Sequence, residues 1–417
     1  MFLYNISIHV FNFALQLVAV FKPKAKQWVV GRKNWQQKLQ QEIISKKITN
    51  PIWMHCASLG EFEQGRPVIE LLKKTHPNKH IVLTFFSPSG FEVQKKYPYA
   101  DVVCYLPIDT LSNATQFISL LKPTMALFVK YEFWLNYLFT LKKSNIPCFL
   151  ISTVIKKHQP FFKWYGGIFR KGLATYRTVF TQDEDSLKLL LELNITTGKL
   201  AGDTRFDRVL QIGLLPKKIK EIEFFPINAF TIVAGSSWQQ DEEYLITSYI
   251  NLKKKYPQLK LIIAPHEIDK RNIDRLKNLL YQYQLSFNLF SENNDEYQHS
   301  ILVINTIGLL SSIYQYGTVA FIGGGFNNGI HNILEPMVYG LPVLFGSNYH
   351  KFNEAFDALK IGAGFEVKSS EDIEQRLTQF LDNEKILQKS SEQAKSYVKE
   401  QAGATQKIVN EITHFIL

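Results

Sequence analysis

The chain has 417 residues, enough for two or three domains, and its 46% hydrophobic and 20% charged residues exclude a disordered or fibrous protein. Its three cysteines form no CxxC pair, which excludes a disulfide framework or a cysteine zinc site and fits a reducing compartment. The formal net charge of +11 indicates a polyanionic partner, and composition leaves nucleic acid, an anionic membrane and a phosphorylated substrate open.

Residues 1–21 form an apolar segment that contains no Asp, Glu, Lys or Arg. As a helix, a segment of this length rises about 31 Å, close to the thickness of a hydrocarbon core. Lys22, Lys24 and Lys26 follow, and basic residues after an apolar segment place the next part of the chain on the cytoplasmic side. We therefore expect a membrane-associated helix here and favour it over an ordinary first helix packed on the core.

Four polar residues inside this segment argue against a plain transmembrane helix. The spacing of Asn5, His9, Asn12 and Gln16 puts them on one helical face. Such a helix either spans the membrane against a partner or lies in the membrane interface. The sequence leaves both arrangements open.

Short apolar runs alternate with helical stretches through the rest of the chain, which predicts parallel α/β sheets. In the first half the predicted strands are Ile52–Ala57, His80–Phe86, Asp101–Leu106, Met125–Val129, Cys148–Ser152 and Thr178–Gln182. In the second half they are Phe230–Gly235, Lys260–Ala264, Ile301–Ile304, Val319–Gly323 and Pro342–Phe345.

This alternation predicts two α/β domains of similar size, 22–210 and 227–400, with a ligand cleft between them at the carboxyl ends of the strands. Residues 211–226 contain two prolines and a cluster of lysines and are predicted to connect the domains. The stretch 371–417 is charged and rich in helix formers, so we expect it to be helical.

The positive charge belongs to the first half, because residues 1–210 carry 28 Lys and Arg against 14 Asp and Glu. Its densest part is 156–177, where basic and aromatic residues alternate. This mixture suits lipid headgroups, single-stranded nucleic acid or a solvated helix face, and the apolar start of the chain favours the membrane. The residues assigned to this surface are Lys156, Lys157, Lys163, Trp164, Arg170 and Lys171.

Glu61 follows the first predicted strand in the run His55–Glu63, HCASLGEFE. Gly60 permits a tight turn, so Glu61 falls near the start of a helix at the carboxyl end of the strand. A carboxylate there can deprotonate a substrate hydroxyl. It also suits a helix N-terminus electrostatically, and spacing alone favours that second interpretation.

A glycine-rich turn, 323–332, follows the predicted strand Val319–Gly323 and precedes a helix that contains Glu335. Backbone N–H groups and a helix N-terminus at such a turn favour phosphate, and the alternative is a flexible loop. The pattern is neither GxGxxG nor a Walker P-loop. Three further loops after strands outline a nucleotide pocket with it: Gly235-Ser236-Ser237-Trp238, Pro265-His266-Glu267 and Thr306-Ile307-Gly308.

Asp183-Glu184-Asp185 resembles a metal-binding DxD, but it opens a predicted helix and is interpreted as a helix start. The sequence contains no HExxH and no convincing cluster of His and Asp. We therefore predict no catalytic metal.

In combination these motifs resemble the 3-deoxy-D-manno-oct-2-ulosonic acid (Kdo) transferases, which move Kdo from CMP-Kdo to a lipid A precursor in lipopolysaccharide synthesis. The resemblance covers nearly the whole chain. It is carried by the apolar start, His55–Glu61 (H-x-A-S-x-G-E), Glu132-Phe133-Trp134, Gly202–Asp207 (GDTRFD), Gly235–Ser237 and Gly323–Glu335 (GGGFNNGIHNILE).

The resemblance implies the GT-B glycosyltransferase fold, with two Rossmann-like domains facing a cleft and a C-terminal helix, 401–417, that crosses back to the first domain. It implies that Glu61 is the general base of an inverting, metal-independent reaction, and that Glu132 and Arg205 stabilise the transition state or position the substrates. It implies CMP contacts at Gly235, Ser236, Pro265, His266, Thr306, Ile307, Gly308, Gly325, Asn332, Ile333, Leu334 and Glu335.

The chain departs from the family pattern at three positions. Arg205 stands where relatives typically have Lys, which keeps the charge but changes the hydrogen-bond geometry. Lys130 stands where many relatives have an acidic residue, so its role is open. Pro265 stands where many relatives have Arg, so one phosphate contact of the pattern is either missing or supplied by another residue.

The resemblance implies CMP-Kdo as donor substrate, no cofactor, and lipid IVA as acceptor at the cytoplasmic leaflet of the inner membrane. The sequence leaves two other functions open. One is another inverting GT-B glycosyltransferase with a membrane-lipid acceptor. The other is a basic nucleic-acid-binding protein, which leaves the apolar start and the glycine turn unexplained, so we expect no nucleic-acid partner. The sequence does not report how many Kdo residues are added.

Overall fold

A computed structural model describes residues 1–220, 222, 225, 229–292 and 299–416. The chain forms two compact units, Met1–Arg208 with Gln401–Leu417, and Val209–Glu400. The boundary at Arg208 lies within helix α10 (Thr204–Leu214). Of the predicted connection 211–226, residues 221, 223–224 and 226 lie outside the described residues.

The first unit is built on a parallel sheet of seven strands in the order β3-β2-β1-β4-β5-β6-β7. Every residue of the central strands β1, β2, β4 and β5 is buried, as expected for a parallel sheet with helices on both faces. The strands are β1 (Ile52–Cys56), β2 (Ile81–Phe85), β3 (Val102–Tyr105), β4 (Met125–Val129), β5 (Cys148–Thr153), β6 (Thr178–Thr181) and β7 (Gly198–Leu200).

The helices of the first unit precede the sheet, connect its strands and return from the end of the chain. They are α1 (Phe2–Val18), α2 (Pro23–Gly31), α3 (Trp35–Ser45), α4 (Leu59–Thr75), α5 (Pro88–Gln94), α6 (Leu111–Leu121), α7 (Leu135–Lys143), η1 (Pro160–Phe162), α8 (Gly167–Leu173), α9 (Glu184–Glu192) and α18 (Ala404–Thr413).

The second unit contains another seven-stranded parallel sheet, in the order β10-β11-β9-β8-β12-β13-β14. Its strands are β8 (Thr231–Ser237), β9 (Lys260–Pro265), β10 (Asn288–Leu289), β11 (Ile301–Val303), β12 (Val319–Ile322), β13 (Val343–Phe345) and β14 (Gly364–Glu366). Its helices are α11 (Gln239–Lys255), α12 (Lys270–Gln282), α13 (Leu310–Ile313), η2 (Tyr314–Tyr316), α14 (Leu334–Met337), α15 (Asn353–Ile361), α16 (Ser370–Asp382) and α17 (Glu384–Gln401).

All eleven strands predicted from the sequence are present, with ends that differ by at most two residues, and both sheets are parallel as predicted. Three strands were missed: β7, β10 and β14. Each has only two or three residues, and in β7 and β14 most of these residues are not buried. Strands this short contain no apolar run that a sequence pattern can report.

Helix α18 brings the end of the chain back to the first unit, where it packs against α4. Asp207 accepts hydrogen bonds from the main-chain N–H groups of Gly403 (2.6 Å) and Thr405 (2.9 Å), which lie at the start of α18. A carboxylate at this position satisfies N–H groups that have no partner within the helix. Ile408 and Ile412 are buried in the core that also contains Phe62 of α4, so α18 supports the helix that carries Glu61.

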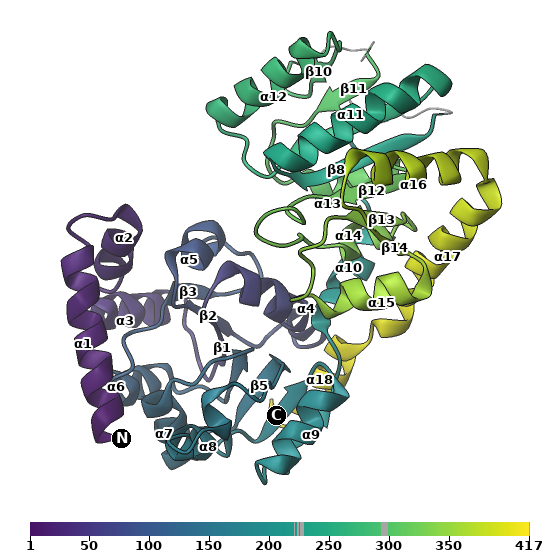
Figure 1. The fold of residues 1–417 in the computed structure, drawn as a ribbon. Helices are drawn as coiled ribbons and strands as arrows, with labels where there is room; N and C mark the ends of the chain where they lie inside the picture. Colours follow the sequence, from purple (N-terminus) through teal and green to yellow (C-terminus); the bar gives the residue numbers. More distant parts are fainter. Residues whose placement is uncertain (221, 223–224, 226–228, 293–298, 417) are drawn as a thin grey trace. The chain divides into compact units, whose positions relative to one another are not determined.

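Helix α1 is formed by the apolar start of the chain and packs along the first unit beside α2 (Figure 1). Its Phe11 ring contacts Trp28 of α2 and Phe86, with ring centroids 6.2 Å apart in both pairs. Within the described residues, no helix combines the length and the apolar character needed to cross a bilayer.

Candidate functional site

In each sheet, successive strands are added first toward one edge and then toward the other, and two loops lie side by side at the switch point where this order reverses. In the first unit this point lies between β1 and β4, and in the second unit between β8 and β12. Ligands of open α/β sheets bind outside the carboxyl ends of the strands at such switch points. The loop after β1 leads to Glu61 and the loop after β4 leads to Glu132. In the second unit, Trp238 follows β8 and the glycine turn follows β12.

Glu61 is held at the third position of α4 by a capping box with Ser58. The main-chain N–H and the hydroxyl of Ser58 donate to Glu61 Oε2, at 2.7 and 2.9 Å. The helix-start role expected from spacing is therefore present. It does not exclude chemistry, because the side chain remains partly exposed and both hydrogen bonds end on one of its two oxygens.

The pKa of Glu61 is raised above that of an ordinary glutamate, mainly because partial burial disfavours the charged form. The negative charge of Glu132 raises it further, whereas the hydrogen bonds from Ser58 and the proximity of His55 lower it. A carboxylate with a raised pKa is a stronger base than an exposed one once it is ionised.

Glu132 is buried and belongs to a hydrogen-bonded network that the sequence did not predict. Its Oε2 lies 3.0 Å from His55 Nε2, and Trp134 Nε1 donates to the same oxygen. A carboxylate oxygen only accepts, so His55 donates through Nε2–H, and its Nδ1 lies 2.9 Å from the hydroxyl oxygen of Thr84. Trp53 Nε1 donates to that hydroxyl, also at 2.9 Å. His55 and Trp134 thus fix the position of the Glu132 carboxylate directly. Thr84 and Trp53 do so indirectly, because they hold the His55 ring.

Arg205 lies at the start of α10 and interacts with Asp203. Its Nε and Nη2 lie 2.8 and 2.7 Å from Asp203 Oδ2, and its main-chain N–H donates to Oδ1 at 2.9 Å. The guanidinium is therefore held in one orientation and stays partly exposed. Lys130, directly after β4, has a left-handed backbone with a φ of 71°.

The glycine turn of the second unit uses several of its own N–H groups. Gly324 donates to Asp241 Oδ2 at 2.8 Å, and Gly329 donates to the carbonyl of Gly324 at 3.0 Å. Gly325 packs so closely on Gly346 that a Cβ at position 325 would lie 2.4 Å from the Gly346 nitrogen. The glycines therefore permit a compact turn, and the N–H of Gly324 is occupied by a carboxylate rather than directed at a ligand.

Asp241 holds this turn and the start of α11 together. Its Oδ2 also accepts from the main-chain N–H of Trp238 at 2.8 Å. The side chain is fully buried, and within the described part of the chain Oδ1 has no hydrogen-bond partner. Burial raises the pKa of Asp241 to about 6.

Three aromatic rings form a stack beside this turn. Trp238 stacks on His266 with ring centroids 4.7 Å apart, and His266 stacks on His331 at 4.4 Å. Trp238 Nε1 donates to His331 Nε2 at 3.2 Å, so the proton of a neutral His331 resides on Nδ1. Burial and His266 lower the pKa of His331 to about 4, which keeps the ring neutral near pH 7.

Sequence reasoning placed Trp238 and His331 in the loops of the nucleotide pocket, but of the three rings it assigned only His266 to CMP. The sequence could have indicated all three rings as site residues, because Trp238 follows β8 and His331 lies in the turn after β12, the two strands that flank the switch point. The remaining residues assigned to CMP lie in the same unit. Asn332 Nδ2 donates to Glu335 Oε1 at 3.1 Å, whereas Ile307 is 83% exposed in its loop.

The lysines of 156–177 and the ring of Trp164 lie on the surface of the first unit, whereas Phe161 is buried and Phe162 and Phe169 pack against the core. Trp164 is 92% exposed, and Lys156, Lys157, Lys163 and Lys171 are also exposed. Arg170 is partly buried because its Nη1 donates to the carbonyls of Phe161 (2.7 Å) and Lys163 (3.3 Å).

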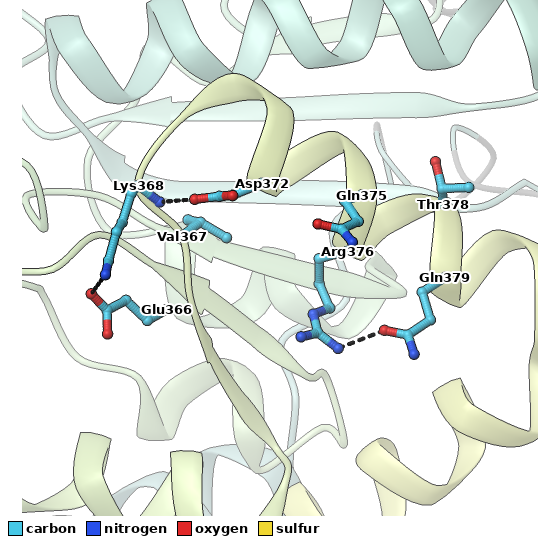
Figure 2. Close-up of a pocket in the computed structure, with 8 residues that line it drawn as sticks. All are labelled: Glu366, Val367, Lys368, Asp372, Gln375, Arg376, Thr378 and Gln379. Atoms are coloured by element: carbon cyan, nitrogen blue, oxygen red, sulfur yellow. Dashed lines mark hydrogen bonds and ion pairs between the residues drawn. The ribbon is translucent and has the colours of Figure 1, made fainter.

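A pocket of about 640 Å³ lies elsewhere in the second unit, between the end of β14 and α16 (Figure 2). Arg376 and Gln379 are hydrogen-bonded to each other across its wall, and the main-chain N–H of Lys368 donates to Asp372. None of the residues assigned to a site from the sequence lines it. Among the described residues, no group of three or more His, Cys, Asp or Glu is placed to hold a metal ion.

Comparison with solved structures first identifies the class of fold. UDP-GlcNAc 2-epimerase from Neisseria meningitidis superposes with a TM-score of 0.61 over 87% of this chain and 100% of that chain, at 16% identity. A UDP-N-acetylglucosamine 2-epimerase from Listeria monocytogenes gives a TM-score of 0.58 over 88% and 97%, at 12% identity. Residues 228–398 match the model of group 1 glycosyl transferases. The two Rossmann-like units are thus those of a glycosyltransferase with the GT-B fold.

The first unit identifies the family. Residues 33–208 match the model of 3-deoxy-D-manno-octulosonic-acid transferases. The enzyme of that name from Aquifex aeolicus is 29% identical over 81% of this chain and 87% of its own length. The one from Haemophilus influenzae is 28% identical over 80% and 79%. The chain belongs to the Kdo transferase family of glycosyltransferases.

Proposed function

We propose that this enzyme transfers Kdo from CMP-Kdo to lipid IVA, a lipid A precursor, without a metal and with inversion at the anomeric carbon. The observation that carries the proposal is Glu61, a partly exposed carboxylate with a raised pKa at the switch point of the first unit. Because Glu61 lies after the carboxyl end of β1, it can act as the base for an acceptor hydroxyl. The match to the Kdo transferase family supports Kdo as the transferred sugar.

In the proposed reaction, a hydroxyl oxygen of the acceptor attacks the anomeric carbon of Kdo while Glu61 takes the hydroxyl proton. Because Ser58 already donates twice to Oε2 of Glu61, we assign the proton to Oε1. The bond between the anomeric carbon and the phosphate oxygen breaks, and CMP leaves with its electron pair. Attack from the face opposite to CMP inverts the configuration.

Two other charged groups have proposed roles in this reaction. We assign the Arg205 guanidinium, held by Asp203, to the negative charge that develops as CMP leaves. We assign Glu132, held by His55 and Trp134, to the positioning of the substrates. The ring stack and the segment Asn332–Glu335 are proposed to hold CMP.

The first unit is also proposed to hold the acceptor at the cytoplasmic leaflet of the inner membrane. Its exposed lysines in 156–177 attract the phosphates of a lipid A precursor and of anionic lipids. Trp164, with its ring almost fully exposed next to Lys163, suits the headgroup boundary where aromatic rings settle.

One assay tests the proposal: purified enzyme, CMP-Kdo and a tetraacyl lipid A precursor, with EDTA present and the products resolved by mass. The expected result is a product heavier by one or more Kdo units. Binding of CMP, UDP and GDP is measured in parallel by thermal shift. Absence of a Kdo adduct together with tighter UDP binding would overturn the proposal in favour of another nucleotide-sugar glycosyltransferase.

A further inference from the structure

Helix α1 is attached to the first unit by its polar residues. The hydroxyl of Tyr4 donates to Asp109 Oδ2 at 2.5 Å and accepts from the N–H of Leu135 at 3.3 Å. Asn5 Oδ1 accepts from Asn136 Nδ2 at 3.0 Å. Asp109 is almost fully buried, so the contact with Tyr4 is part of the interior of the unit.

The opposite face of α1 is apolar and exposed. Six exposed apolar residues make up this face, and at 3.6 residues per turn they fall within an arc of about 100° around the helix axis. Their exposure ranges from 43% for Ile6 to 80% for Leu3, and Val20 and Phe21 extend the surface beyond the helix. The six residues are Phe2, Leu3, Ile6, Val10, Phe13 and Leu17.

Polar residues border this apolar face on both sides. Ser7 lies along one edge, and His9 and Gln16 lie along the other, all of them exposed. The polar stripe seen in the sequence is therefore divided, since Asn5 and Asn12 are half-buried against the protein. A helix with an apolar outer face and polar edges has the pattern of a helix that lies in a membrane interface.

The charge around α1 matches an anionic surface. The first acidic residue of the chain is Glu42, whereas Lys22, Lys24, Lys26 and Lys33 follow α1 closely and are exposed. Each basic residue near an anionic leaflet strengthens binding, and the effect falls off within about 10 Å. Apolar burial and charge attraction thus act on the same short segment.

We propose that α1 lies flat in the surface of an anionic lipid monolayer, with its apolar face among the acyl chains and its polar face still bonded to the first unit. Spanning the bilayer would require α1 to leave Asp109 and Asn136, which would deprive a buried carboxylate of its Tyr4 partner. This inference rests on the membrane location proposed above, but not on the donor or the acceptor.

The first experiment measures binding of the full chain to vesicles of phosphatidylethanolamine with and without phosphatidylglycerol. Two variants carry the same added charge on the same helix: Val10→Asp with Leu17→Asp on the apolar face, and Ser7→Asp with Gln16→Asp at its edges. We expect the first pair to lower partitioning more than about tenfold and the second pair to retain most of it. All four positions are exposed, so thermal unfolding in solution serves as the folding control.

Equal losses from the two pairs, or no binding of the wild-type chain to anionic vesicles, would overturn the proposal. The result is independent of catalysis. If the vesicles bind as expected but CMP-Kdo yields no product, the proposed function fails and the inference stands.

The second experiment separates a flat helix from a spanning one. Spin labels are attached to Leu3→Cys and Leu17→Cys, and their immersion depth is read from oxygen and nickel accessibility. The two sites are separated by about 21 Å along the helix axis. A flat helix places both labels at the same depth, whereas depths that differ by most of that length would overturn the proposal. The wild-type chain, treated with the same spin label, measures background labelling of the native cysteines. We expect this background to be low, because Cys56 and Cys148 are buried and Cys104 is partly buried.

Discussion

The two units hold their candidate site residues by different interactions. In the first unit the side chains are titratable and joined by hydrogen bonds, as in the pair His55–Glu132 and the box Ser58–Glu61. In the second unit the rings of Trp238, His266 and His331 are held by stacking, and the buried carboxylate of Asp241 bonds to main-chain N–H groups. Both arrangements lie at the switch point of a parallel sheet.

In the proposed reaction, this difference separates proton transfer in the first unit from CMP binding in the second. A carboxylate such as Glu61 changes charge with pH, so we expect the proposed proton transfer in the first unit to depend on its ionisation. His331 has a pKa lowered to about 4 and stays neutral near pH 7, so its own contribution to CMP binding is expected to vary little near that pH. The fold provides a switch point at the carboxyl ends of the strands in both units, and the residues of the adjacent loops determine the chemistry of each switch point.

The largest expected effect is on the proposed base. Glu61→Gln keeps the size of the side chain and removes its ability to take a proton, so we expect kcat to fall by roughly 100- to 10,000-fold. Binding of CMP, measured by calorimetry, should not change. Glu63→Gln is the matched control, since Glu63 lies on the same helix and pairs with Arg66. Near-normal turnover of Glu61→Gln would remove Glu61 as the base.

The next effect is on the stability of the second unit. Asp241→Ala leaves the N–H groups of Trp238 and Gly324 without an acceptor, so we expect the free energy of unfolding to fall by about 2–4 kcal/mol. Asp241→Asn keeps an oxygen for both groups and should lose much less. Urea unfolding of the two variants checks this contrast, and equal losses would contradict it.

The same position predicts a pH dependence. The pKa of Asp241 is about 6 in the folded unit and near 3.8 in the unfolded chain, so between these values the folded unit holds a proton that the unfolded chain has lost. The free energy of unfolding therefore falls as pH rises from about 4 to 6. Asp241→Asn should flatten this slope in urea titrations, and an unchanged slope would assign it to other groups such as Asp109, whose pKa is also raised to about 6.

A smaller effect is expected from the indole N–H in the ring stack. Trp238→Phe preserves a stacked ring but removes the hydrogen bond to His331 Nε2. Because one hydrogen bond contributes about 1 kcal/mol, the affinity for CMP should fall by roughly fivefold. Isothermal titration with CMP measures the change, and an unchanged affinity would show that the orientation of His331 does not matter for binding.

The most subtle effect concerns the acidic limb of the pH–rate profile. Ser58→Ala removes a hydrogen bond that lowers the pKa of Glu61, so the limb should move to higher pH. Glu132→Gln removes a negative charge that raises this pKa, so the limb should move to lower pH. Profiles of kcat at saturating substrate report the direction. Shifts in the same direction would separate the limb from Glu61.

The fold was predictable where strands are buried on both faces. Met125–Val129 is a continuous apolar run in the sequence and a fully buried strand in the structure. β10 and β14 were not predictable, because two or three residues at the edge of a sheet are defined only by the neighbour they pair with. Glu61 was predictable as a candidate because it follows a strand directly. Glu132, whose charge helps to raise the pKa of Glu61, was assigned to the site only by resemblance to a family.

By itself, the sequence determined the alternation of strands and helices, the concentration of positive charge before residue 211 and the place of Glu61 and of the glycine turn after their strands. Those features depend on residues adjacent in the chain. Only the tertiary structure decided that His55 bonds to Glu132 across 77 residues, that Trp238 bonds to His331 across 93, and which face of α1 contacts the protein. The physical reason is that hydrogen bonds and stacked rings form over a few ångströms, between groups that only the packing of the sheets brings together.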